Sequence, residues 1–150
     1  MALSPGDPAP DFALPDQTGT VRSLQDLLAD GPVVLFWYPA AMTTGCTKEA
    51  CHFRDIAAEF EAAGAQRVGI SADAVDKQRE FDEKHSLGYP LLSDEDKSVA
   101  KAYGVKRMGP LMNKRMTFVI GTDGKLVEVI SSELNMDKHA DQALAALSAV

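Results

Sequence analysis

Five consecutive β-favouring residues, Val33 to Trp37, constrain the fold more than any other feature of the sequence. A continuous apolar run of this kind is typical of a strand that is covered on both faces. A helical pattern follows from about Thr44 to Ala63, and Gly64 is placed to end that helix. The apolar stripe of this helix recurs at spacings of 4, 3, 4 and 3 and consists of Cys46, Ala50, Phe53, Ala57 and Phe60. A buried strand that leads into an amphipathic helix predicts a layered α/β fold.

The rest of the chain alternates short strands with helices. Residues 11–14 and 20–21 flank turn-forming residues and predict an N-terminal hairpin. Helices are expected at 24–28 with Ser23 as the cap, at 74–85 with Asp73 as the cap, at 98–103 and at 137–149. Further strands are expected at 68–71, 91–92, 116–120 and 126–130, the last two as a hairpin. We therefore expect a single domain over residues 1–150, with a mixed central sheet flanked by helices and an N-terminal hairpin extension.

Composition excludes several classes of protein. The chain has 150 residues and a formal net charge of −7, and an acidic chain lacks the basic surface that binds nucleic acid or anionic lipid. Its longest apolar run, 33–42, is far shorter than the roughly 20 residues of a membrane span, and no signal peptide is expected. Two cysteines are too few for a disulfide scaffold. We expect a cytoplasmic protein in which the cysteines are catalytic or metal-binding.

Cys46 falls in the first turn of the helix that follows the buried strand. The free N–H groups and partial positive charge of a helix N-terminus stabilise a thiolate, which is the nucleophilic form of cysteine. For a lone cysteine, a small buried side chain is the simpler interpretation. The neighbours favour a reactive thiol: Thr43 offers a hydroxyl to the helix end, the sulfur or a substrate oxygen, Gly45 lets a ligand approach the backbone, and Pro39 shapes the loop.

The segment FWYPAAMTTGCTKE, residues 36–49, resembles the active-site motif Pro-x-x-x-Thr-x-x-Cys of the peroxiredoxins. Its continuation Gly-Cys-Thr-x-Glu-x-Cys, residues 45–51, is similar to the Q-type branch, also called the bacterioferritin comigratory protein branch. The segments RMTFVI at 115–120 and GDPAPDFAL at 6–14 match further patterns of the family. The resemblance covers most of the chain and implies a thioredoxin-like fold and a thiol peroxidase.

The resemblance also implies roles for single residues. Cys46 would be the peroxidatic cysteine, Thr43 and Arg115 its activating partners, and Cys51 the resolving cysteine. The substrate would be a peroxide and the reductant thioredoxin or a similar thiol, with a monomer or weak homodimer as the assembly. No cofactor and no metal are expected.

The mouth of the pocket departs from the family pattern, because Ala40, Ala41 and Met42 precede Thr43 and Thr44 follows it. These residues make the entrance more apolar. The aromatic residues 36–38 are expected mostly in the core, but Tyr38 is next to Pro39 and is a candidate to line the pocket together with Met42. An apolar loop that comprises Met108, Pro110, Leu111 and Met112 is a candidate wall, with ordinary packing or a partner surface as the alternatives. A pocket walled in this way would favour organic hydroperoxides over hydrogen peroxide.

Peroxide reduction is a displacement by sulfur at oxygen, and it needs donors for the charge that develops on the leaving oxygen. Arg115 suits this task, because a guanidinium stays charged and carries several donors in a fixed fork. Glu49 lies on the Cys46 side of the helix, where an unpaired carboxylate would oppose thiolate formation. We therefore expect Arg115 or Arg54 to pair with Glu49. The alternative is a first-turn glutamate that is favoured only by the helix dipole.

The spacing of the two cysteines restricts how they could form a disulfide. Five residues along a helix place their Cα atoms about 8–9 Å apart, whereas disulfides need about 4.4–6.8 Å. If Cys46 and Cys51 lie on one helix, its first turns must unwind before the bond can close. From spacing alone, Cys51 is equally well a spectator thiol.

Three other functions are open. Cys46, Cys51 and His52 could contribute to a zinc site, although structural zinc needs four ligands at paired spacings. A thioredoxin-like disulfide carrier would have Cys-x-x-Cys instead. A non-enzymatic interaction domain is the third. We expect His52, His85 and His139 on helix surfaces. Residues 94–96 are expected to form a solvated acidic turn and the start of a helix.

Overall fold

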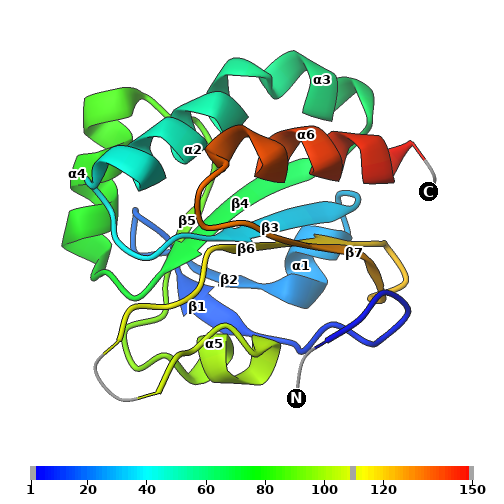
Figure 1. The fold of residues 1–150 in the computed structure, drawn as a ribbon, viewed down its shortest axis with the longest axis horizontal. Coiled ribbons are helices and arrows are strands. Elements are labelled where there is room, and N and C mark those ends of the chain that lie inside the picture. The colour runs from blue at the N-terminus through cyan, green and yellow to red at the C-terminus, as the bar shows by residue number, and fades with distance from the viewer. Residues whose placement is uncertain (1–2, 109–110, 149–150) are drawn as a thin grey trace.

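A mixed five-stranded sheet forms the centre of the molecule (Figure 1). The computed structural model describes residues 3–108 and 111–148. The strands lie in the order β5-β4-β3-β6-β7 and comprise β3 (Val33–Trp37), β4 (Gln66–Ser71), β5 (Leu91–Ser93), β6 (Met116–Ile120) and β7 (Leu126–Ser131). β3 runs parallel to β4 and antiparallel to β6, and all of its residues are buried. The predicted central strand and mixed sheet are confirmed.

Helices cover both faces of the sheet (Figure 1). Side chains from α2 (Thr44–Asp55), α3 (Ala57–Ala62), α4 (Val75–His85) and α6 (Met136–Leu147) share one core with Val34 and Phe36. Side chains from α1 (Leu24–Leu28) and α5 (Ser98–Tyr103) share a second core with Val33, Leu35 and Trp37. Because neighbouring residues of a strand point to opposite faces, the single run Val33–Trp37 supplies both cores. Within these described residues, no helix combines the length and apolar content that crossing a membrane requires.

The N-terminal hairpin is present as β1 (Ala13–Pro15) and β2 (Val21–Ser23), which pair antiparallel. Its turn is organised by the buried Asp16, whose carboxylate accepts bonds from Thr18 N at 2.8 Å and Arg22 Nε at 2.9 Å. Ser23 caps α1 as predicted, with its hydroxyl accepting from Asp26 N.

The helix predicted from Thr44 to Ala63 is two helices, because Ile56 leaves the helical conformation at φ −104° and ψ 31°. The apolar spacing continues through this break, so the pattern could not reveal it. Phe53 on α2 stacks on Phe36 of β3 with ring centroids 4.2 Å apart, and Phe60 on α3 packs against Phe53. The far end of α2 is therefore anchored on the central strand.

Two acidic residues differ from their predicted roles. Asp73 does not cap α4; its carboxylate instead accepts bonds from Ala41 N and Ser71 Oγ, both at 2.7 Å, and so holds the loop before α2. Asp94 is buried, not solvated, because it accepts bonds from Val99 N and Ala100 N in the first turn of α5. The last predicted helix ends at Leu147, and the predicted end at Ala149 and the loop residue Pro110 lie outside the described residues.

Candidate active site

Cys46 lies in the first turn of α2, where β3 ends and the chain turns into the helix. Its side chain is buried, with 1% of the residue exposed. Neither Cys46 nor Cys51 is in a disulfide. This is the predicted placement: a thiol at the positive end of a helix, below the surface of the protein.

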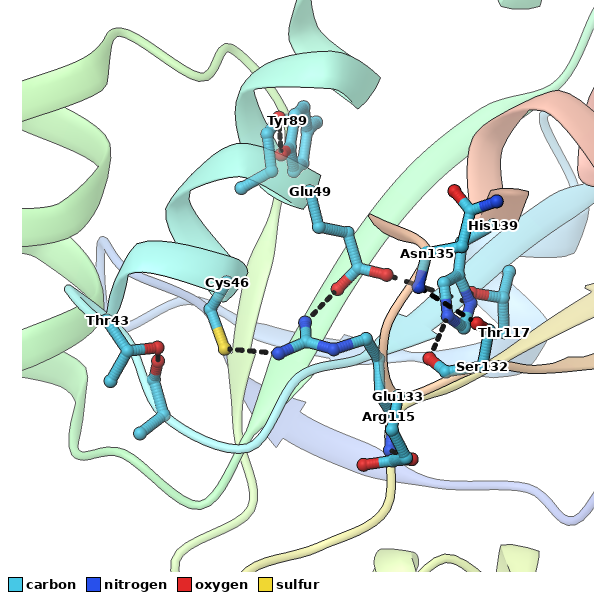
Figure 2. A network of polar contacts seen from close by, with 12 residues as sticks. Thr43, Cys46, Glu49, Tyr89, Arg115, Thr117, Ser132, Glu133, Asn135 and His139 are labelled. Atoms are coloured by element: carbon cyan, nitrogen blue, oxygen red, sulfur yellow. Dashed lines mark hydrogen bonds and ion pairs between the residues drawn. The ribbon is translucent and has the colours of Figure 1, made fainter. Parts of the chain in front are cut away.

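Arg115 reaches the sulfur from the neighbouring strand. It directly precedes β6, whose first residue, Met116, pairs with Trp37 at the end of β3. Sheet pairing thus brings Arg115 to the edge where α2 begins. Its Nη2 donates a hydrogen bond to Cys46 Sγ at 3.3 Å (Figure 2). Two residues 69 positions apart in the chain are joined by this contact.

The same guanidinium binds Glu49. Arg115 Nη1 donates to Glu49 Oε1 at 2.8 Å, and both side chains are buried. Burial raises the pKa of Glu49 to about 8, although the charge of Arg115 opposes this shift. Of the two arginines that the sequence left open, Arg115 makes this pair, whereas Arg54 bonds to Asp55 and to His85 O.

A second carboxylate, that of Glu133, binds the backbone of Arg115. Its Oε2 accepts from Arg115 N at 2.8 Å, and its Oε1 accepts from Arg107 Nη2 at 3.1 Å. Glu133 lies between β7 and α6, a connection to which the sequence analysis assigned no role. The backbone and the side chain of Arg115 are therefore fixed by different carboxylates.

Thr43 precedes the first residue of α2 in an extended conformation, but its hydroxyl bonds neither to the helix end nor to the sulfur. Thr43 Oγ1 instead donates to Ala40 O at 2.8 Å (Figure 2). The residue is exposed, so this hydroxyl lies at the protein surface near the start of α2. The predicted capping bond is absent.

The loop that carries Pro39 and Met42 is held in a restricted shape. Both residues are partly buried, and Met42 has φ 70°, a left-handed conformation that a non-glycine residue seldom adopts. Gly45 is packed tightly, since a Cβ there would lie 3.0 Å from Met136 Cε and 3.3 Å from Arg115 Nη2. The missing side chain of Gly45 therefore makes room for α6 and for the guanidinium.

Tyr38 does not line a pocket, and that prediction is wrong. The side chain is wholly buried, and its hydroxyl donates to Gln78 Oε1 on α4. Burial raises the pKa of Tyr38 above its ordinary value. Its place in the core follows from the strand pattern, because Tyr38 continues the alternation of Val34 and Phe36.

His139 was expected on a helix surface and is instead wholly buried beside Glu49. Its Nδ1 lies 2.7 Å from Thr117 Oγ1 and 3.7 Å from Glu49 Oε2, and its Nε2 lies 2.8 Å from Ser132 O (Figure 2). A signal for this burial was present in the sequence. His139 shares a spacing of four with the buried residues Ala143 and Leu147 of α6.

Cys51 lies on α2 with Cys46 and is partly buried. The helix is intact between them, so the two thiols are held apart as the spacing predicts. Tyr89 binds α2 between the two cysteines, since its hydroxyl donates to Ala50 O at 2.7 Å. His52 is bonded to Asp141 on α6 at 2.9 Å. Over residues 3–108 and 111–148, no three His, Cys, Asp or Glu side chains are grouped to hold a metal ion.

Comparison with known proteins agrees with this arrangement. Residues 5–129 match the AhpC/TSA family. The crystal structure of peroxidoxin BcpB from Mycobacterium tuberculosis is similar with a TM-score of 0.94 and 62% identity, over 99% of this chain and 98% of that one. The bacterioferritin comigratory protein of Xanthomonas campestris, studied for alkyl peroxide reduction, is similar with a TM-score of 0.82 and 32% identity, over 92% and 90%.

A chloroplastic peroxiredoxin Q of Oryza sativa subsp. japonica is 39% identical over 150 residues, which cover 99% of this chain and 68% of the plant protein. The mixed sheet and its two helical layers are the thioredoxin-like fold that these proteins share. The chain therefore belongs to the AhpC/TSA family and is a peroxiredoxin, a thiol peroxidase similar to the Q-type, or bacterioferritin comigratory protein, branch.

Proposed function

We propose that this peroxiredoxin reduces hydrogen peroxide and organic hydroperoxides through the thiolate of Cys46. The observation that carries the proposal is the bond from Arg115 Nη2 to Cys46 Sγ, at the N-terminus of α2. Helix end and guanidinium both favour negative charge on the sulfur, and thiolate is the reactive form. The guanidinium is also in place to stabilise charge on the leaving oxygen.

The first step is displacement at oxygen. The Cys46 sulfur attacks the terminal oxygen of ROOH, the one that carries hydrogen, the O–O bond breaks, and the alkoxide that leaves takes up one proton. The products are a sulfenic acid on Cys46 and the alcohol ROH, or water when the substrate is hydrogen peroxide. The thiol is oxidised and the peroxide is reduced by two electrons.

Cys51 is the proposed resolving thiol. Its attack on the Cys46 sulfenic acid releases water and forms an intramolecular disulfide. Because both residues lie on α2, the first turns of this helix must unwind before the sulfur atoms can meet. A dithiol reductant of the thioredoxin type then returns both cysteines to thiols by exchange.

Two loops with apolar side chains support the use of organic hydroperoxides. Met108, Leu111 and Met112 are exposed in the loop before Arg115, and Met42 is partly buried in the loop before α2. We propose that these side chains border the path of the peroxide, where they would favour an alkyl group over water. The Xanthomonas protein, whose structures concern alkyl peroxide reduction, supports the same choice. Higher efficiency with cumene hydroperoxide than with hydrogen peroxide is the expected result, and equal efficiency would contradict it.

The proposed setting is the cytoplasm, where a pair of free thiols is kept reduced. A monomer or a weak homodimer is the proposed assembly. Sedimentation of the reduced protein over a range of concentrations tests the assembly, and a stable higher oligomer would contradict it.

Mass spectrometry after one equivalent of peroxide tests the chemistry. The wild-type protein should lose two hydrogens as the disulfide forms. Cys51→Ser should stop at a sulfenate on Cys46 that dimedone captures, and Cys46→Ser should not react. Oxidation of Cys46→Ser at the wild-type rate would refute the assignment.

A further inference from the structure

The buried carboxylate of Glu49 is only half satisfied in the site. Its Oε1 accepts the bond from Arg115, but its Oε2 has no hydrogen-bond partner among the described residues. A buried carboxylate oxygen without a partner is costly. The polar group that faces Oε2 is Nδ1 of His139, 3.7 Å away, just beyond hydrogen-bond distance (Figure 2).

The contacts of His139 fix where its protons lie. Nε2 faces Ser132 O, and because a carbonyl oxygen can only accept, Nε2 carries hydrogen. In the neutral ring Nδ1 is then a bare acceptor, which receives the hydroxyl of Thr117 at 2.7 Å. Because Nδ1 has a single lone pair, a proton of the Glu49 carboxyl reaches this nitrogen when Glu49 moves slightly and the Thr117 hydroxyl turns away. The imidazole is thus oriented as an acceptor for a protonated Glu49.

The charges of the site favour such a proton. A thiolate on Cys46 and a carboxylate on Glu49 would share the single positive charge of Arg115. One proton on the Glu49–His139 pair restores neutrality in a space that water does not reach. Protons on coupled groups belong to the pair and not to either residue.

Several charged or titratable groups surround the Glu49–His139 pair, on each of the elements packed against it. Burial raises the pKa of Glu49 to about 8 and lowers the pKa of His139. Both shifts favour a protonated carboxyl beside a neutral ring. The groups that act on one or both residues are Arg115 before β6, Glu133 before α6, Lys138 on α6 and Tyr89 before β5, with Cys46 on α2 bound to Arg115.

We propose that His139 is a positioning residue of the peroxidatic site, which holds one proton jointly with Glu49 and so leaves the charge of Arg115 to the sulfur of Cys46. The inference rests on the proposed role of Cys46. His139 acts through Glu49 and Arg115 and does not itself contact the thiol. When the pair loses its proton, the second negative charge draws the guanidinium toward Glu49 and the reaction slows.

The pH profile of sulfenate formation tests this role. Rates with cumene hydroperoxide would be measured from pH 5 to 10 in a Cys51→Ser background, where Cys46 is the single thiol. The parent should show a descending limb on the alkaline side. His139→Phe should move that limb to lower pH by about one unit, because one of the two sites that hold the proton is gone.

Glu49→Gln provides the decisive comparison. This variant keeps a neutral side chain at every pH, so the alkaline limb should vanish, and adding His139→Phe should change the profile no further. His52→Phe is the matched control, because His52 joins α2 to α6 through Asp141 without facing Glu49. It should leave the limb in place. A limb that His139→Phe does not move, or that it moves equally in the Glu49→Gln background, overturns the proposal.

NMR of the unsubstituted chain decides the matter even if His139→Phe does not fold. The Nδ1 shift of His139 should change in the same pH step as the side-chain carboxyl carbon of Glu49. An Nδ1 shift that stays constant through that step refutes the shared proton. This readout does not depend on turnover, so failure of the peroxidase assignment and failure of the Glu49–His139 pair are distinguishable.

Discussion

Arg115, which directly precedes β6, reaches Cys46 in the first turn of α2, with its Nη2 3.3 Å from the sulfur. The other arm of the fork is held by Glu49, and the backbone nitrogen is held by Glu133. A guanidinium bound through two of its nitrogens, on a backbone held at a third point, cannot turn away from the thiol without breaking a bond. The arginine is therefore set in place before a peroxide arrives, which is the condition under which electrostatic stabilisation is most effective.

Arg115→Lys should lower the rate of sulfenate formation by about 10²–10³, because one ammonium cannot serve the sulfur and the carboxylate together. Stopped-flow measurement with an organic hydroperoxide would check this. Arg107→Lys is the matched control, since Arg107 is partly exposed and also bonds to Glu133. It should change the rate by no more than about threefold. Equal losses in both variants would mean that the fork of Arg115 has no special role at the sulfur.

Tyr89→Phe should speed closure of the Cys46–Cys51 disulfide. The Tyr89 hydroxyl bonds to Ala50 O, between the two cysteines, so it opposes unwinding of α2. Loss of a bond of about 1 kcal/mol corresponds to roughly fivefold faster closure. The rate is measured by quenching with acid after peroxide is added. In Tyr103→Phe, a comparable hydroxyl bond to Pro10 O is removed on the other face of the sheet, and closure should keep its wild-type rate.

Glu49→Gln should flatten the dependence of stability on pH. Burial raises the pKa of Glu49 from 4.5 to about 8, so between these values the folded chain keeps a proton that the unfolded chain releases. The free energy of unfolding therefore falls as pH rises through this window. In urea titrations, the free energy of unfolding of Glu49→Gln minus that of wild type should be higher at pH 9 than at pH 5. Glu80→Gln, exposed on α4, should follow the wild-type curve, and parallel curves for Glu49→Gln would contradict the prediction.

Asp16→Asn should destabilise the protein by about 1–3 kcal/mol, because a buried carboxylate that accepts several bonds is replaced by an amide. Burial raises the pKa of Asp16, but bonds from Thr18 and Arg22 outweigh it and lower the pKa overall. This contribution is present above the ordinary aspartate pKa and is lost as pH falls through the lowered one. The difference between Asp16→Asn and wild type should shrink in acid, as urea titrations at pH 7 and pH 3 would show. A constant difference would exclude the ionised form as the cause.

Much of the centre of the fold could be predicted, because the signals are local. The run Val33–Trp37 defines the central strand, and the helical stripe after it places Cys46 at a helix start. The contact of Arg115 with Glu49 was one of two options, and only strand pairing decides between them. A sequence spacing could not show that Ile56 breaks the helix, because the apolar period continues through it.

The polar surroundings of the site were harder to predict. His139 meets residues on α2, β6 and the loop after β7. Its spacing of four with Ala143 and Leu147 indicates the buried face of α6, but contacts so distant in sequence leave no local pattern that names the partners. Asp94 was misassigned because an acidic run resembles a solvated turn, whereas its buried oxygens satisfy two backbone nitrogens of α5.

The stacking of Phe53 on Phe36 has a consequence for the proposed cycle. The second half of α2 is anchored on the central strand by this aromatic contact, while the first half carries the contacts of Cys46 and Glu49 with Arg115. In the proposed cycle, oxidation releases those contacts while the anchored half keeps its helical shape. After reduction, the unwound turns can re-form on this anchored half, so each proposed cycle ends with the helix in its starting conformation.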